Sequence, residues 1–176
     1  MKKLLVMVLM AISLCACSVK TNIIPIESSE VDMSLYRKME NVEHHFRAVT
    51  PQEISRVIDE GGSAAFYIGN IFCPTCNKMV YIIEEAAKQS GTTVYYYDTM
   101  YGGYTPEDEP VIDLVEHLSP VLFTDERGFK VINTPHVFVV KNGEIISSSI
   151  GKPEAGNEDF VEHATKLYRE MFEAIK

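Results

Sequence analysis

The feature that most constrains the fold of this 176-residue chain is a pair of cysteines at the junction of a strand pattern and a helix pattern. Residues 63–68 form a short apolar run that predicts a buried strand. Residues 74–89 carry apolar side chains at helical spacing, which predicts a helix. Cys73 therefore lies at the N-terminus of a predicted helix, and Cys76 lies one turn inside it.

The two cysteines differ in their expected reactivity. At a helix N-terminus, unsatisfied backbone N–H groups and the positive end of the helix dipole favour a thiolate at Cys73. Pro74 is tolerated in the first turn, where its missing N–H would have no partner, and Thr75 completes the spacer. Because Cys76 should be less exposed, we expect Cys73 to attack a substrate disulfide and Cys76 to resolve the mixed disulfide.

Two structural roles compete with this interpretation of the pair. A disulfide that closes so short a loop stabilises a fold by only about 2 kcal/mol, against about 3 kcal/mol for a 15-residue loop, and short C-x-x-C disulfides open easily. A zinc site needs two further ligands. The sequence has no second C-x-x-C or H-x-x-x-H, and the adjacent His44 and His45 would face opposite sides of a strand. We therefore expect no metal and no cofactor.

The first residues predict export. Two lysines precede the apolar run 4–14, which at 11 residues is shorter than the roughly 20 that a membrane-spanning helix needs. Residues 1–16 are therefore interpreted as a secretory leader. Residues 14–17, Leu-Cys-Ala-Cys, resemble a bacterial lipobox, which implies lipidation of Cys17 and an extracytoplasmic, lipid-anchored domain at the cell membrane. A cleaved leader that releases a soluble protein is the alternative.

Charge and composition limit the classes of partner that the mature chain can bind. Removal of the leader takes two lysines from a chain of net charge −9, which leaves −11. Such an acidic domain is unsuited to binding nucleic acid through a basic face. Residues 17–35 are polar and lack a sustained apolar period, so we expect a flexible tether there. Residues 36–176 should then form one domain.

Patterns in the rest of that domain predict alternating strands and helices. Residues 50–53, Thr-Pro-Gln-Glu, form a capping box before a short helix. Asn142-Gly143 is the strongest hairpin signal in the chain. The remaining predicted elements are strands at 45–49, 92–97, 136–140 and 145–150, helices at 110–118 and 157–175, and an insertion at about 99–130.

Taken together, these motifs resemble the thioredoxin superfamily over residues 50–176: C-x-x-C after a buried strand, Thr134-Pro135 entering a strand, the Asn-Gly hairpin and a final helix. The resemblance implies an α/β fold, a three-layer α/β/α sandwich with a central mixed sheet and the insertion before a cis proline. It also implies that Pro135 is cis and lies against the cysteine pair, although only about 5–6% of X-Pro bonds are cis. Thr134 would offer backbone N–H and C=O groups to an extended substrate.

The sequence departs from cytosolic thioredoxins near the cysteines. Phe72 stands where they carry Trp, and Tyr67 stands where they carry a buried acid. Pro74 is similar to the first spacer residue of Dsb-type exported proteins, and the anchored layout with its insertion is similar to bacteriocin transport accessory proteins. His136, directly after the cis proline, either tunes Cys73 or contacts substrate, or is a solvent-facing strand residue.

These patterns predict an extracytoplasmic thiol-disulfide oxidoreductase that exchanges disulfides with protein or peptide substrates. A membrane redox partner is expected to recycle it, and the electron direction stays open. The alternative is a non-enzymatic accessory module of the same fold, which holds an extended peptide for a bacteriocin-type secretion system.

Overall fold

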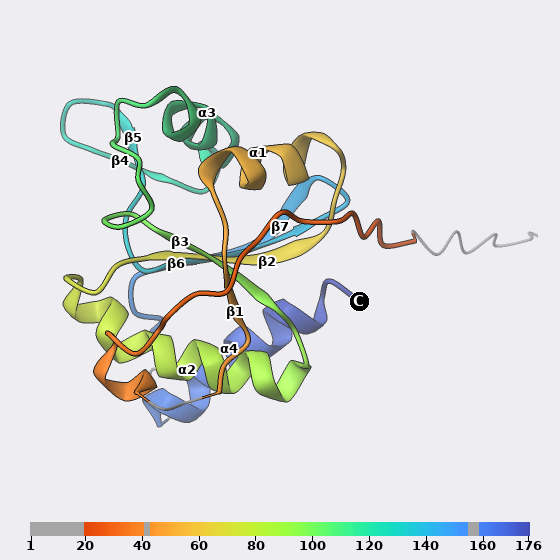
Figure 1. The fold of residues 1–176 in the computed structure, drawn as a ribbon, viewed down its shortest axis with the longest axis vertical. Coiled ribbons are helices and arrows are strands. Elements are labelled where there is room, and N and C mark those ends of the chain that lie inside the picture. Colours follow the sequence, from red (N-terminus) through yellow and green to blue (C-terminus); the bar gives the residue numbers. More distant parts are fainter. Residues whose placement is uncertain (1–19, 41–42, 155–158) are drawn as a thin grey trace, which may run out of the picture.

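A computed structural model describes residues 20–40, 43–154 and 159–176 of the chain (Figure 1). The predicted leader and Cys17 lie outside the described residues, as do residues 41–42 and 155–158. Within the described part, no helix has the length and apolar character needed to span a membrane.

A five-stranded mixed sheet forms the centre of the molecule. Its strands, in spatial order, are β1 (Phe46–Ala48), β3 (Val94–Asp98), β2 (Ala64–Gly69), β6 (His136–Lys141) and β7 (Glu144–Ile150). β1, β3 and β2 are parallel, whereas β6 runs antiparallel to β2 and β7 antiparallel to β6. The expected parallel start and antiparallel finish of the sheet are therefore confirmed.

Helices cover both faces of this sheet (Figure 1). α1 (Pro51–Asp59) and α3 (Glu109–Leu118) lie on one face, and α2 (Pro74–Ser90) and α4 (Phe160–Glu173) lie on the other. Because side chains alternate across a strand, β2 contributes Phe66 to the first layer and Tyr67 to the second. The α/β/α sandwich expected from the sequence is confirmed, with one apolar core on each side of the sheet.

Local sequence signals set the ends of the main elements. The Thr50 side chain accepts a hydrogen bond from the Glu53 backbone N–H at 3.3 Å, which caps α1. α2 ends at Gly91, which adopts a left-handed conformation with φ of 61°. Asn142 and Gly143 both have positive φ and connect β6 to β7. The cap at Thr50 and the Asn142-Gly143 turn were predicted from the sequence, and both place the central elements correctly.

The segment expected to be a flexible tether, residues 17–35, lies against the domain from Lys20 onward, so the structure differs from that prediction. Ser29 exchanges backbone hydrogen bonds with Ala48 on the sheet edge, and Met33 is 1% exposed in the core. The apolar side chains come in short alternating pairs, Ile24 with Ile26 and Val31 with Met33. Such pairs are too short to give a sustained period, yet they suffice to cover the edge of β1.

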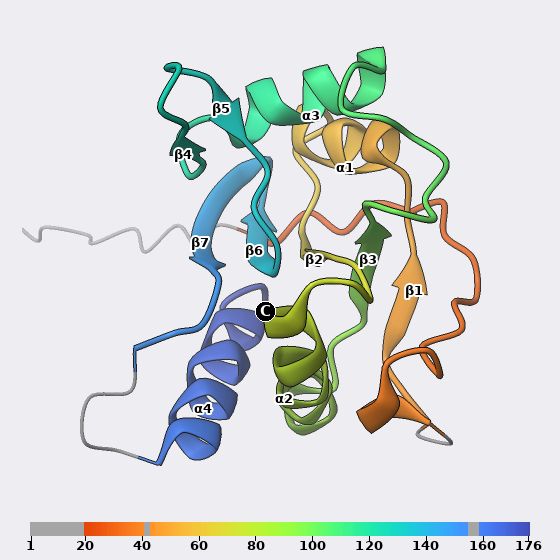
Figure 2. The ribbon, with the colours of Figure 1, turned by 90° about the vertical axis from the view of Figure 1, so that its left-hand side faces the viewer.

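The insertion between β3 and β6 contains more structure than the sequence predicted. Besides α3, it forms a small hairpin of β4 (Phe123–Thr124) and β5 (Lys130–Val131), which lies with α3 at one end of the molecule (Figure 2). Two-residue strands carry too little pattern to be predicted. A short 3₁₀ helix, η1 (Arg37–Met39), also precedes the first strand and packs on α2.

Candidate active site

The cysteine pair lies where β2 leads into α2. Cys73 is the N-cap residue of α2 and is half-buried, whereas Cys76 lies one turn inside the helix and is fully buried. The Cys76 backbone N–H donates a hydrogen bond to the Cys73 sulfur at 3.1 Å. A backbone N–H group from the first turn of the helix therefore faces the Cys73 sulfur.

The loop before β6 meets the same sulfur. The Thr134-Pro135 peptide bond is cis, as expected from the resemblance. The Cys73 Sγ donates to the Thr134 carbonyl oxygen at 3.4 Å, while Thr134 itself is half-buried and Pro135 is buried. The structure therefore brings together residues 61 positions apart, as the sequence analysis predicted.

Two asparagines that the sequence analysis missed hold the turn before Cys73. The Asn70 side chain accepts from the Phe72 backbone N–H at 3.0 Å and donates to the Thr99 hydroxyl at 2.8 Å. The Asn77 side chain donates to the backbone carbonyls of Ile71 at 2.6 Å and Cys73 at 3.1 Å. An asparagine whose side chain bonds the backbone two residues further on is a known turn signal, and this signal could have identified Asn70.

The other residues predicted to support the cysteine pair lie beside it and are at least partly exposed. Phe72 is 62% exposed and contacts the ring of Tyr101, with 6.1 Å between the ring centroids. Pro74 is exposed and Thr75 is half-buried at the start of α2. An exposed aromatic side chain of this kind can make an apolar contact with another polypeptide.

Burial distinguishes the second cysteine chemically. Burial, together with the side-chain hydrogen bond with Cys73, raises the pKa of the Cys76 thiol from 9.0 to about 11. At neutral pH Cys76 is therefore a thiol, and it must lose a proton before it can attack a disulfide.

Alkylation tests this difference. In the Cys73→Ser variant, Cys76 is expected to react with iodoacetamide at pH 8 far more slowly than a small thiol of pKa 9, because burial, the largest cause of its raised pKa, remains when Cys73 is replaced. Its rate should also keep rising above pH 9. Mass spectrometry of quenched samples gives the rates. Labelling of Cys76 as fast as the small thiol would show that the side chain is accessible and ionised.

A layer of tyrosines lies behind Cys76. Tyr67, at the position of the missing acid, is fully buried and stacks on Tyr96, with 5.1 Å between the ring centroids. Burial raises the pKa of Tyr67 well above 10, so this hydroxyl stays neutral and cannot serve as a base at neutral pH. The Tyr96 hydroxyl lies 3.0 Å from that of Tyr36 and donates to the Asp98 carboxylate at 2.9 Å.

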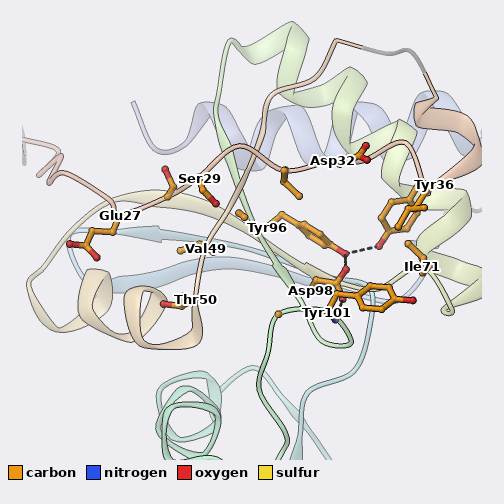
Figure 3. Close-up of a pocket in the computed structure, with 15 residues that line it drawn as sticks. Glu27, Ser29, Asp32, Tyr36, Val49, Thr50, Ile71, Tyr96, Asp98 and Tyr101 are labelled. Atoms are coloured by element: carbon orange, nitrogen blue, oxygen red, sulfur yellow. Dashed lines mark hydrogen bonds between the residues drawn. The ribbon is translucent and has the colours of Figure 1, made fainter.

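The Tyr36–Tyr96–Asp98 chain forms one wall of a cavity of about 610 Å³ between the N-terminal segment and the ends of β1 and β3 (Figure 3). Ile71, two residues before Cys73, also lines this cavity. No pattern in the sequence indicated that Tyr36, from the N-terminal segment, would meet Tyr96.

The structure corrects the prediction for His136. This side chain is fully buried and its Nε2 lies 2.8 Å from the Ser148 hydroxyl, so it is not a solvent-facing strand residue. It shares the face of β6 that bears Phe138, whereas Cys73 packs on the core of the opposite face. His136 therefore belongs to the α1–α3 side of the sheet.

This burial makes His136 a pH-dependent element of stability. Burial lowers its pKa from 6.5 to about 4, so the unfolded chain binds a proton that the folded chain does not. The contribution is complete above pH 6.5 and is lost as the pH falls to 4, where about 3 kcal/mol of unfolding free energy should be missing.

Urea unfolding of the wild type and His136→Gln at pH 7 and pH 4 measures this contribution. The variant keeps a polar partner for Ser148 but has no titrating ring, so it should lose about 3 kcal/mol less between the two pH values. Equal losses in both proteins would assign the acid sensitivity to other groups.

Among the described residues, no three His, Cys, Asp or Glu side chains are grouped so as to hold a metal ion. The cysteine pair thus has no further ligands near it in that part of the chain.

The sheet order, with β6 antiparallel beside β2 and two helices on each face, decides the fold. The fold is thioredoxin-like. No protein-family model matches the sequence, and no curated protein does. Among solved structures, the chain is similar to thioredoxin O2 of Arabidopsis thaliana, with a TM-score of 0.45, 13% identity, and coverage of 73% of this chain and 96% of that one.

Two further thioredoxins show a likeness of the same order. The thioredoxin of Aeropyrum pernix has a TM-score of 0.45 and 15% identity, with 76% of this chain and 99% of that one covered. The oxidised thioredoxin of Plasmodium falciparum has a TM-score of 0.44 and 16% identity, with 71% and 96% covered. The likeness is distant, and the fold assignment rests on the topology of this chain.

Proposed function

We propose that this chain is an extracytoplasmic thiol-disulfide oxidoreductase that acts on protein or peptide substrates. The observation that carries the proposal is the environment of Cys73: its sulfur is half-buried at a helix N-terminus, accepts an N–H from Cys76 and contacts the Thr134 carbonyl. A sulfur in this position has a hydrogen-bond donor beside it and is exposed enough for a substrate disulfide to approach.

The exchange proceeds through two sulfur–sulfur displacements. The Cys73 thiolate attacks one sulfur of a substrate disulfide, which breaks the substrate S–S bond, forms a mixed disulfide and releases one substrate thiolate. Cys76 then loses its proton and attacks the Cys73 sulfur, which releases the second substrate thiolate and leaves a Cys73–Cys76 disulfide. The substrate gains two electrons and the pair loses two, and the reverse sequence oxidises a dithiol substrate.

The proposed location follows from the sequence outside the described residues. A leader at 1–16 and lipid on Cys17 would place the domain outside the cytoplasm, on the membrane surface, with a redox partner in that membrane recycling the pair. In such a compartment a dithiol can be kept either oxidised or reduced, depending on that partner.

One observation favours a second candidate, a non-enzymatic module that holds an extended peptide. Tyr67 stands where a base could deprotonate Cys76, and its raised pKa keeps it neutral. Because Cys76 itself has a raised pKa, resolution of a mixed disulfide would be slow unless the substrate complex supplies a base.

Turnover assays separate the two candidates. The reduced protein should reduce insulin disulfides, or the oxidised protein should accelerate the reactivation of a reduced, unfolded substrate, in either case far above the rate of the Cys73→Ser/Cys76→Ser double variant. Absence of turnover in both directions, with peptide binding kept in the double variant, would instead support the binding module.

A further inference from the structure

A second cavity, of about 530 Å³, opens between the active-site loops and the insertion. From the active-site side it is lined by Asn70 and Thr134, and from the insertion by Val111, Ile112, Val115 and Ile132. Asn70 and Thr99, which directly follow β2 and β3, line the cavity, and α3 lies with the β4–β5 hairpin at one end of the molecule (Figure 2). In open α/β sheets, ligands bind at the carboxyl ends of the strands.

This cavity lies next to residues that contact or hold the active-site turn. Thr134 lines the cavity, and its carbonyl oxygen lies 3.4 Å from the Cys73 Sγ. Asn70 lines it too, and the same side chain holds the backbone of Phe72, next to Cys73. A polypeptide whose cysteine meets Cys73 therefore has a neighbouring side chain within reach of the cavity.

The walls of the cavity determine which side chain fits. They are mainly aliphatic and aromatic, with Tyr97 and Tyr104 among them, and of the residues that the structure describes, Lys130 is the only charged one that lines them. The Lys130 ammonium group donates to the Leu122 carbonyl at 2.8 Å, so it already has a partner. Ile112 leaves 56% of its surface exposed, and apolar surface beside a pocket favours an apolar occupant.

We propose that the insertion forms a subsite for an apolar or aromatic side chain of the substrate, a few residues from the cysteine that reacts with Cys73. This inference rests on the proposed function and names its substrate class: unfolded or extended chains with an apolar residue near the cysteine. When an apolar side chain enters the cavity, both it and the Ile112 side chain lose contact with water. This burial of apolar surface stabilises the complex.

Peptide exchange tests the subsite. The test uses pairs of peptides, each with one cysteine held as a mixed disulfide with glutathione. The two peptides of a pair differ at a single position within three residues of the cysteine, where one carries Phe and the other carries Ser. At one or more positions, the reduced protein should react about tenfold faster with the Phe peptide. In Ile112→Asp this Phe/Ser ratio should fall to about one, because the aspartate places a charge at the cavity wall.

Val161→Asp is the matched control. Val161 lies on α4, is 52% exposed and does not line the cavity, so its substitution places the same charge on a comparably exposed site. The control should keep the tenfold ratio. The subsite is refuted if the wild type shows no preference at any position, if the preference survives Ile112→Asp, or if Val161→Asp abolishes it equally.

Binding without exchange separates failure of the subsite from failure of the proposed function. The same peptides with serine in place of cysteine carry a fluorescent label, and their binding is followed by anisotropy. Tighter binding of the Phe peptide, lost in Ile112→Asp, supports the subsite even if the protein exchanges no disulfide. Equal binding of the Phe and Ser peptides overturns the subsite even if all peptides exchange.

Discussion

Replacement of Cys73 by serine is expected to lower disulfide exchange by on the order of 10³ or more, because a serine hydroxyl at the N-cap of α2 keeps the hydrogen bond from Cys76 but supplies no thiolate. Replacement of Cys76 by serine should have a different effect. The first displacement still occurs at Cys73, but nothing resolves the mixed disulfide, so the substrate stays attached.

The two variants control for each other, since each removes one sulfur and adds one oxygen at positions three residues apart. Non-reducing gels and mass spectrometry should find substrate on Cys73 of the Cys76→Ser variant and almost none on Cys76 of the Cys73→Ser variant, because Cys76 is fully buried and its pKa is raised to about 11. Substrate trapped only through Cys76 would mean that the assigned order of attack is wrong.

The second large effect is expected in the core. Phe138 on β6 is fully buried and stacks on Phe66 of β2, with 5.1 Å between the ring centroids. Phe138→Ala removes this contact and leaves a cavity between strands that carry the active-site loops, so the free energy of unfolding should fall by about 3–5 kcal/mol. Urea unfolding followed by far-UV circular dichroism gives the value.

Phe123→Ala is the control for Phe138→Ala. Phe123 lies on β4 in the insertion and is 60% exposed, so its truncation should change the free energy of unfolding by about 0.5 kcal/mol or less. If Phe138→Ala does not fold, Phe138→Leu provides a smaller change at the same site and should still be less stable than Phe123→Ala. Equal effects at the two positions would contradict the packing described for β2 and β6.

Strong local signals explain how much could be predicted. The cysteine spacing, the cap at Thr50 and the Asn142-Gly143 turn each act over a few residues, and the structure places all three as expected. The contact between Cys73 and Thr134 was predicted only through the resemblance to a known superfamily, since no local pattern joins residues 61 positions apart.

The failures of prediction concern contacts made across the fold. His136 was judged by its neighbours along the chain, but strand alternation in the folded sheet buries it beside Phe138. The N-terminal segment was judged by its polarity, but the edge of β1 offers backbone partners that a sequence pattern does not reveal. Tyr36 meets Tyr96 only because that segment folds back.

The central claim is that Cys73 and Cys76 form one redox pair that exchanges electrons with substrates. The most direct test equilibrates the domain from residue 20 to residue 176 in buffers with graded ratios of reduced to oxidised glutathione. The samples are then quenched with acid and measured by mass spectrometry. We predict a single two-electron transition in which both thiols disappear together and the chain loses two hydrogens without gaining glutathione. Independent modification of the two cysteines, or a stable glutathione adduct on Cys73 with Cys76 still reduced, would contradict the claim.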